Sequence, residues 1–327
     1  MAVKPERTES PLVTVVIAAY NREGCVGEAI ESILAQKAAF PCEILVVDDG
    51  STDRTADVAR SYGHPVRVLS KENGGPASAR NAGVLAAESP FIAFLDSDDL
   101  MLPGRLAEQA AFLISHPDVV LTFGDIIFDP SPDESYLSNR CGLPFERGRW
   151  LIVEEPYRRL LTECNFVPNQ TTMFRKNDYI KAGMMDESLR VSEDWELWSR
   201  MTSLGKFAYF CAPFARVRRH LGNHLMSSSF MRTDMARALH RMLLRDRVLR
   251  DDERRKALAF FRRLFRQLLR YDLLERGRRE MLKDLREMGA WLGRWYRFRW
   301  WAASLIPRFL ARFISRIRSR RLRPAPQ

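Results

Sequence analysis

Apolar runs alternate with amphipathic segments through the first half of the chain. The runs typical of buried strands are residues 13–20, 43–50, 65–70, 91–96 and 119–128, and two later strands are predicted at 171–176 and 206–210. Helical spacing of apolar residues, and flanking Ser, Pro or Gly, predict helices at 26–36, 51–63, 76–88 and near 193–204. This alternation predicts an α/β fold with a largely parallel sheet.

The stretch 129–170 has no clear period and is rich in Pro, Asn and charged residues. Segments of this kind after core strands are typical of loops that face a substrate. We therefore expect irregular structure there, and no internal repeat is evident along the chain.

From about residue 235 the pattern changes and predicts helices. Apolar residues at i, i+3 and i+4 spacing, with arginines on the other face, are Ala257, Phe260, Phe261, Leu264, Phe265, Leu268 and Leu269. The sequence thus predicts an α/β domain over residues 1–234 and a basic α-helical region over residues 235–327.

Charge divides along the same line. The 327 residues carry a net charge of +11. From residue 241 onward there are 26 Lys and Arg against 9 Asp and Glu, a net of +17, whereas the first 240 residues carry a net of −6. Two regions of opposite charge suggest two different tasks.

Composition argues against several classes of protein. The first ten residues are polar and lack the apolar region of a signal peptide, and no apolar run approaches the ~18 residues of a transmembrane helix. The five cysteines are odd in number, widely spaced and form no CxxC pair. We expect free thiols in a reducing cytoplasm.

Acidic residues follow two of the predicted strands. Asp48 and Asp49 end one strand, and Asp96, Asp98 and Asp99 follow another. Ligands of parallel α/β sheets bind at the carboxyl ends of the strands, and crowded carboxylates need a cation or hydrogen-bond donors. A divalent ion held with nucleotide diphosphate oxygens would meet that need. The alternative is that these acids cap loops and helices in solvent.

Five motifs in order give these acids a context. They are "VTVVIAAYNRE", "EILVVDDGSTDRT", "NGGPASARNAG", "FIAFLDSDD" and "SEDWELW". Together they resemble the inverting nucleotide-sugar glycosyltransferases of family 2, over roughly residues 12–230. The resemblance implies a GT-A (Rossmann-like) fold with a mixed, mainly parallel sheet flanked by helices, and the basic C-terminal region lies outside it.

The resemblance implies roles for residues that hold the nucleotide sugar. The turn Ala19, Tyr20 and Asn21 would hold the base and ribose, and Asp49 would accept a hydrogen bond from the base. The base expected is uracil. Gly75 would let the backbone approach the nucleotide or sugar closely.

The same resemblance implies a metal loop. Asp96, Ser97 and Asp98 match the family's DxD motif; Asp98 would bind a divalent cation, Mn²⁺ or Mg²⁺, directly, and Asp96 would lie near the ribose or the water shell of the metal. Arg80 would lie beside the base and this acidic loop; the alternative is an ordinary arginine on a helix surface.

A third metal ligand is suggested further along the chain. Residues 216–228 resemble a segment that closes over the diphosphate in many relatives, and His220 matches a histidine that helps bind metal in some of them. A surface or packing role for His220 is the alternative, in which case Arg218 and Arg219 could contact phosphate.

Inversion by direct displacement needs a base for the acceptor hydroxyl. "SEDWELW" resembles the family's ED motif, which points to Asp194 as the base and places Glu193 near the acceptor or sugar. The alternative is that Ser192 caps a helix whose first turn favours acids. Both can hold, because a helix N-terminus is a rigid mount for a base.

The sequence therefore predicts a metal-dependent inverting glycosyltransferase. It would transfer one sugar from a nucleotide diphosphate donor, a UDP-sugar by preference, to a hydroxyl of a glycan or lipid-linked acceptor in cell-surface polysaccharide or glycolipid synthesis. The processive QxxRW motif is absent. A sugar nucleotidyltransferase and a catalytically inactive binding protein of the same fold are the alternatives.

The final segment interleaves aromatic residues with arginines. Between Leu305 and Ile317 apolar residues cover one face of a predicted helix, beside a stripe of arginines. This pattern predicts a helix in the interface of an anionic membrane, and hence a cytoplasmic protein peripheral on the inner face of the membrane. A tail packed on its own catalytic domain is the alternative, and a nucleic-acid partner is not expected.

Overall fold

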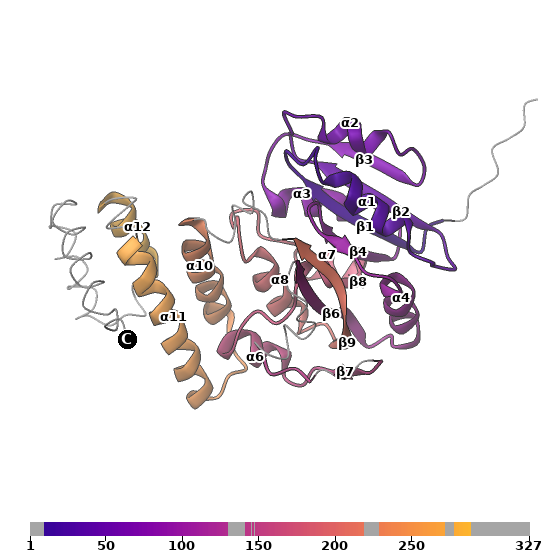
Figure 1. The fold of residues 1–327 in the computed structure, drawn as a ribbon. Coiled ribbons are helices and arrows are strands. Elements are labelled where there is room, and N and C mark those ends of the chain that lie inside the picture. Colours follow the sequence, from indigo (N-terminus) through magenta and orange to yellow (C-terminus); the bar gives the residue numbers. More distant parts are fainter. Residues whose placement is uncertain are drawn as a thin grey trace, which may run out of the picture. The chain divides into compact units, whose positions relative to one another are not determined.

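The computed structural model describes residues 10–129, 141–144, 146, 148–218, 229–271 and 278–288. The chain divides into two compact units, Met1–His224 and Leu225–Gln327, and each is considered by itself (Figure 1).

A mixed sheet forms the centre of the N-terminal unit. Its strands are β1 (Val13–Ala19), β2 (Cys42–Asp48), β3 (Val66–Ser70), β4 (Phe91–Asp96), β5 (Leu100–Met101), β6 (Val119–Asp129), β7 (Trp150–Ile152), β8 (Met173–Arg175) and β9 (Lys206–Arg218). Their order is β3-β2-β1-β4-β8-β6-β9-β5, with β7 also paired to β9. The longer pairings are parallel, and those of β5, β7 and β8 are antiparallel.

Helices flank this sheet on both faces. They are α1 (Val26–Leu34), α2 (Thr55–Arg60), α3 (Pro76–Ala86), α4 (Arg105–Ser115), α6 (Pro156–Thr162), α7 (Lys176–Lys181) and α8 (Glu193–Met201), with a short 3-10 helix η1 (Asn169–Thr171). The flanked mixed sheet agrees with the fold predicted from the sequence.

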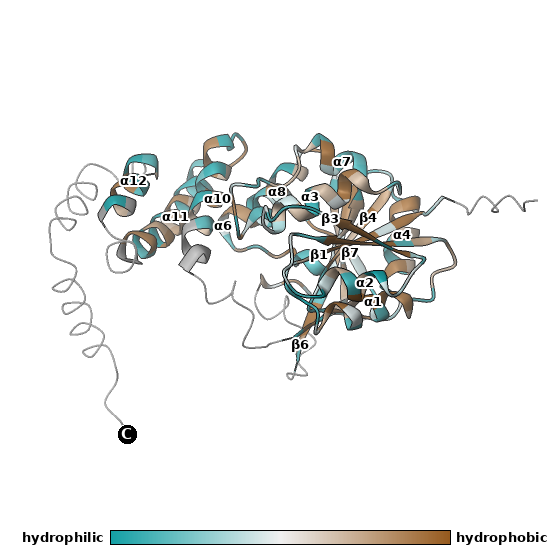
Figure 2. Cartoon of the chain, turned by 90° about the horizontal axis from the view of Figure 1, so that it is seen from above, coloured by the Kyte–Doolittle hydropathy of each residue, from teal (hydrophilic) through white to brown (hydrophobic). Residues whose placement is uncertain are grey.

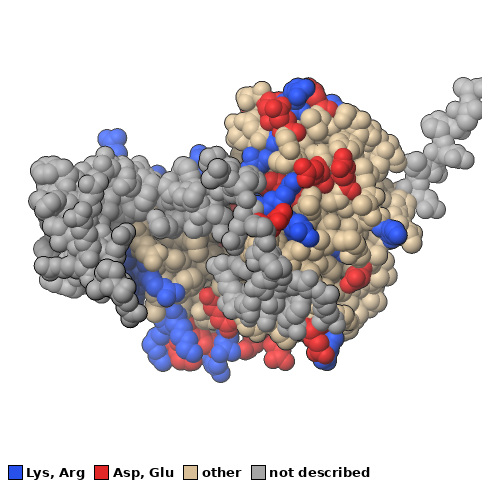
Figure 3. Space-filling view, in the orientation of Figure 1, with Lys and Arg blue, Asp and Glu red and all other residues tan. Residues whose placement is uncertain are grey.

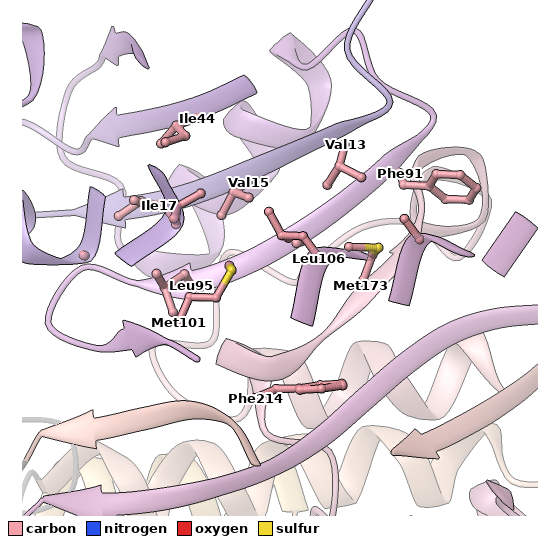
Figure 4. Packing of buried hydrophobic residues seen from close by; sticks show 14 of the residues in the cluster. Val13, Val15, Ile17, Ile44, Phe91, Leu95, Met101, Leu106, Met173 and Phe214 are labelled. Carbon is pink, nitrogen blue, oxygen red and sulfur yellow. The ribbon is translucent and has the colours of Figure 1, made fainter. Parts of the chain in front are cut away.

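Alternating side chains of the central strands supply both layers of the core. Val13, Val15 and Ile17 of β1 point to one face, where they join a buried cluster with residues of α1 and α4 (Figure 4). On the other face α3 lies close to the sheet, because Gly83 has no side chain: a Cβ there would come within 2.4 Å of Val16.

The strand registers bring the acidic strand ends to one edge. In the parallel pairings Ala18 lies opposite Asp96, and Ala19 lies opposite Asp48. The ends of β2 and β4 therefore flank the end of β1, as the topology of a parallel α/β sheet predicts.

Several elements differ from the sequence-based expectation. Helix α4 was not predicted, and the stretch 129–170 holds β7 and α6 rather than irregular structure alone. Helix α2 begins at Thr55, four residues after the predicted start, because Asp53 holds a turn there: its carboxylate accepts hydrogen bonds from the backbone N–H and the hydroxyl of Thr55.

The described part of the C-terminal unit is helical. It contains α10 (Ser229–Arg245), α11 (Asp251–Tyr271) and α12 (Arg278–Met288). The domain boundary predicted from the sequence, between residues 234 and 235, falls within α10. Of the residues spaced for the apolar face of α11, Ala257, Phe261, Leu264, Phe265, Leu268 and Leu269 are buried. Hydrophilic and hydrophobic residues both occur along each of these helices (Figure 2). Among the described helices, none has the length and apolarity required to span a bilayer.

Candidate active site

A tight turn after β4 gathers three carboxylates. The N–H of Asp99 donates to the carbonyl of Asp96 at 3.1 Å, which closes the turn around Asp98. Asp99 is buried, and its carboxylate accepts from the N–H of Arg218 at 3.2 Å. Burial, and then the negative charges of Asp96 and Asp98, raise the pKa of Asp99. The turn is therefore a concentration of negative charge, held by backbone from β9.

Arg80 links this turn to the ED motif. One guanidinium nitrogen donates to Asp96 Oδ1 at 2.8 Å, and the other donates to Glu193 Oε1 at 2.6 Å. The Arg80 side chain is 11% exposed and that of Glu193 is 7% exposed. Asp96 thus shares one largely buried cation with Glu193, which follows Arg80 by 113 positions in the chain. The alternative of an ordinary surface arginine is wrong for Arg80.

The surroundings keep Arg80 charged. Burial alone would lower its pKa, but the charges of Asp96 and Glu193 raise it above its ordinary value. The guanidinium lies 5.9 Å from the centre of the Phe94 ring. The Asn169 amide faces it as well; with its oxygen turned inward, this amide accepts from Arg80 Nε at 3.2 Å.

Helix α8 begins at Glu193, so both acids of the ED motif lie in its first turn. Ser192 precedes the helix with a left-handed φ of 65°, and its side chain makes no capping hydrogen bond, which contradicts the alternative that Ser192 caps this helix. Asp194 instead accepts from the N–H of Trp195 at 2.6 Å, and Asn165 donates to its other oxygen at 3.4 Å. The helix end therefore fixes Asp194 in place.

Burial changes the acidity of both residues. It is the largest cause that raises the pKa of Glu193, Asp194 adds to this rise, and Arg80 opposes it. Burial likewise raises the pKa of Asp194, again against the effect of Arg80. An aspartate with a raised pKa is a stronger proton acceptor once ionised.

Asp49 organises the loop that precedes α3. Its carboxylate accepts from the N–H of Gly74 at 3.0 Å, from the N–H of Gly75 at 2.8 Å and from Lys71 Nζ at 2.9 Å. Gly75 has φ 88°, a left-handed conformation that favours glycine. In this conformation the Asp49 carboxylate thus accepts its hydrogen bonds from groups of the protein itself. Asp49 directly follows β2 and is 3% exposed.

The turn after β1 is tied to the loop after β2. Ala19 accepts from the N–H of Asp49 at 2.9 Å, and Asn21 Oδ1 accepts from the N–H of Thr52 at 2.8 Å. Asn21 is itself left-handed, with φ 52°. Tyr20 lies between them and is 47% exposed, so its ring is available to a ligand at this edge.

The metal residues predicted from the sequence are only partly within the described chain. Asp98 Oδ2 lies 3.7 Å from Arg22 Nε, Ser97 is buried, and the Arg218 guanidinium donates to the carbonyl of Asp98 at 2.6 Å. His220 lies outside the described residues. In the described ranges, no three His, Cys, Asp or Glu side chains gather closely enough to hold a metal ion.

The donor set nevertheless fits a divalent ion that binds with substrate. Mg²⁺ is usually bound by one or two carboxylates together with phosphate oxygens. Asp96 and Asp98 offer such a pair, and the pKa of the adjacent Asp99 is raised first by burial and then by the negative charges of these two residues. Hard oxygen ligands of this kind suit Mg²⁺ or Mn²⁺.

Sequence reasoning missed the buried Arg105, which opens α4. Its guanidinium donates to the carbonyls of Phe94 and Thr172, both at 2.9 Å, and of Gln170 at 2.6 Å. Burial lowers the pKa of Arg105 to about 9, and Asp96 opposes this. Arg105 thus ties η1, which carries Asn169, to the strand that carries Asp96. The helical spacing of apolar residues over 106–113 was the signal in the sequence that could have identified α4.

Comparison with known proteins extends this description. The profile of "Glycosyl transferase family 2" matches residues 14–182. The chain is similar to an uncharacterized glycosyltransferase of Rickettsia prowazekii (33% identity, 58% of each chain) and to the succinoglycan biosynthesis protein ExoO of Rhizobium meliloti (34% identity, 62% of this chain and 58% of ExoO). The chain thus spans less than two thirds of the length of each relative.

A solved structure supports the fold independently. S. aureus TarS 1-349 in complex with UDP-GlcNAc matches with a TM-score of 0.61 at 21% identity, over 78% of this chain and 72% of TarS. This likeness confirms the predicted GT-A fold. Since the family profile covers more than half of the 327 residues, the chain belongs to glycosyl transferase family 2.

Proposed function

We propose that this chain is a metal-dependent, inverting glycosyltransferase that moves one hexose from a UDP-sugar to an acceptor hydroxyl. The observation that carries the proposal is the Arg80 bridge, which joins Asp96 of the DxD motif to Glu193 of the ED motif. A donor-binding turn and a base-bearing helix are thereby held on either side of one buried cation.

In the proposed reaction Asp194 accepts the proton of the acceptor hydroxyl. The acceptor oxygen forms a bond to the anomeric carbon as the bond from that carbon to the phosphate oxygen breaks, and the electron pair leaves with UDP. Attack from the opposite face inverts the anomeric configuration. Glu193 stays close to the acceptor or sugar, and Arg80 favours its ionised form and orients it.

Asp98 and Asp96 would hold the divalent cation, with His220 as a third ligand. A bound cation stabilises the charge that develops on the departing diphosphate. The turn of Ala19, Tyr20 and Asn21 would hold the uracil and ribose, with Asp49, the backbone at Gly75 and Ser97 around the nucleotide.

The names of similar proteins support the choice of donor and acceptor class. TarS was solved with UDP-GlcNAc, and ExoO is named for succinoglycan biosynthesis. We therefore propose a UDP-sugar donor and a glycan or lipid-linked acceptor in cell-surface polysaccharide or glycolipid synthesis. Residues 288–327 lie almost wholly outside the described chain; we propose that they hold the protein on the inner, anionic face of the membrane.

Donor hydrolysis tests the proposal directly. The full chain should release UDP from a panel of UDP-sugars with Mn²⁺ or Mg²⁺, and should lose this activity with EDTA. An inactive binding protein would be stabilised by a donor without releasing UDP. A sugar nucleotidyltransferase would instead consume UTP and a sugar phosphate and release pyrophosphate. Either of these two outcomes contradicts the proposal.

A further inference from the structure

The turn between α10 and α11 exposes two large apolar side chains. Leu244 is 61% exposed and Val248 is 70% exposed, and the other exposed large apolar residues of the described chain range from 39% to 59%. A single exposed apolar residue is ordinary on a protein surface, but two in one short turn form a local apolar tip. We define residues 244–250 as the α10–α11 turn.

The acidic residue of this turn is buried, whereas the basic residues on either side of it are exposed. Arg245 and Arg247 are exposed, and they stand on either side of Asp246 in the chain. The Asp246 side chain is fully buried and accepts from the N–H groups of Val248 and Leu249, each at 3.1 Å. The only acid of the turn therefore points inward, and its basic and apolar residues remain outside.

An ion pair completes the neutralisation of Asp246. Its second oxygen accepts from Arg254 Nη1 of α11 at 3.1 Å. The next buried acid, Glu253, is paired in the same way with Arg250 at 2.6 Å. Two acids near the turn thus contribute little negative potential outside the protein.

The flanking sequence keeps the local charge positive. Residues 241–256 contain seven arginines and lysines against four acids, of which only Asp251 and Asp252 are exposed. Arg255 and Lys256, one turn into α11, are exposed as well. Basic side chains, with acidic ones among them, gather at the end of α11 that meets α10 (Figure 3).

We propose that the α10–α11 turn is a contact surface for an anionic phospholipid membrane. Leu244 and Val248 enter the boundary between headgroups and acyl chains, and Arg245 and Arg247 contact lipid phosphates. Membrane binding by apolar burial alone or by cationic attraction alone is marginal, but binding that combines the two is stable. This proposal deepens the membrane association proposed for residues 288–327, because it names a second surface within the described chain.

Photo-crosslinking of the full chain reads out this surface without interference from residues 288–327. A photoreactive benzophenone amino acid replaces Val248 in one variant and Leu85, which is 54% exposed on the N-terminal unit, in the control. With vesicles of phosphatidylglycerol and phosphatidylethanolamine, position 248 should form lipid adducts and position 85 should not. With vesicles of phosphatidylcholine alone, adducts at 248 should be few.

Substitutions measure the contribution of the turn to binding. Leu244→Ser with Val248→Ser, and separately Arg245→Gln with Arg247→Gln, should each weaken partitioning to anionic vesicles by about tenfold. Leu85→Ser with Ile114→Ser, at comparably exposed positions, should leave it unchanged. UDP release in solution should be the same in all three variants, which separates failure here from failure of the proposed glycosyl transfer.

Two results would overturn the membrane surface. Vesicle binding without lipid adducts at position 248, and with equal partitioning of all variants, would assign binding to another part of the chain. Crosslinking of position 248 in cells to an acidic protein, and not to phospholipid, would make the turn a protein-docking site instead.

Discussion

The two units of this chain differ in how far the arginine partners of their buried acids are exposed. In the N-terminal unit Arg80 is buried and shared by Asp96 and Glu193, so positive and negative charges meet inside the protein. In the C-terminal unit Asp246 and Asp284 are buried and form ion pairs with arginines, while other basic residues are exposed. Opposite charges meet at the candidate active site in one unit, and basic side chains are exposed on the surface of the other.

This difference shows that the net charge of a unit does not reveal which of its charged side chains are buried in ion pairs and which are exposed. A buried ion pair responds strongly to the loss of one partner, because the other partner remains uncompensated. An exposed charge contributes little to stability by itself and acts through the sum of its neighbours. The predictions below test this contrast from the largest expected effect to the smallest.

Arg80→Met should cost the most stability, about 3–5 kcal/mol, because it leaves Glu193 and Asp96 without their shared cation. Thermal or urea unfolding measures the loss. Arg255→Gln, which removes an exposed arginine of α11, should change stability by no more than ~0.5 kcal/mol. Glu193→Gln added to Arg80→Met should recover part of the loss. Equal effects for Arg80 and Arg255 would break the contrast between the units.

Asp194→Asn should lower kcat by about 10² or more, the usual scale for loss of a general base, and keep donor affinity within a few fold. Glu193→Gln should lower kcat less. Since the pKa of Asp194 is raised, the acid limb of the kcat profile should lie above the ordinary aspartate range, and activity should fall as pH drops through it. The reverse ranking of the two variants would move the base to Glu193.

Asp98→Asn should remove the thermal stabilisation that a UDP-sugar gives together with Mn²⁺. At a ligand concentration of about 100 Kd, this stabilisation is worth ~2.7 kcal/mol in the native protein. Unfolding of the ligand-free variant should stay close to that of the native chain. If metal-dependent stabilisation persists in Asp98→Asn, the turn after β4 does not hold the cation.

Asp246→Asn should have the smallest effect of these buried sites, about 1–3 kcal/mol, because it weakens one ion pair while its amide oxygen can still accept from the turn. Unfolding of the full chain measures it, and UDP release should not change. A loss as large as that of Arg80→Met would mean that the C-terminal unit also depends on buried charge.

Much of the fold could be predicted because its signals are local. Unbroken apolar runs identify strands covered on both faces, and β1, β2 and β4 appear within one or two residues of their predicted limits. Helix α4 was missed although Leu106, Ala110 and Leu113 follow helical spacing. Short antiparallel strands such as β7 carry too few residues for a pattern to emerge.

The candidate site was predicted in part for the same reason. The acids at the ends of β2 and β4 were expected at one edge of the sheet, but the partner of each acid could not be read from the spacing of residues. Arg105 is an example: its four hydrogen-bond acceptors come from α4, β4 and the segment around η1, and three of them are backbone carbonyls that carry no sequence signature.

The sequence by itself determined which residue types end the strands, which helix faces are apolar, and that a basic region follows an acidic one. Only the tertiary structure decided that Arg80 bridges Asp96 and Glu193, and that Asp246 turns inward while Arg245 and Arg247 stay exposed. The physical reason is that strand and helix signals arise from neighbours along the chain. Charge pairing and burial depend on how segments pack in the folded chain, and for Arg80 on residues far apart in sequence.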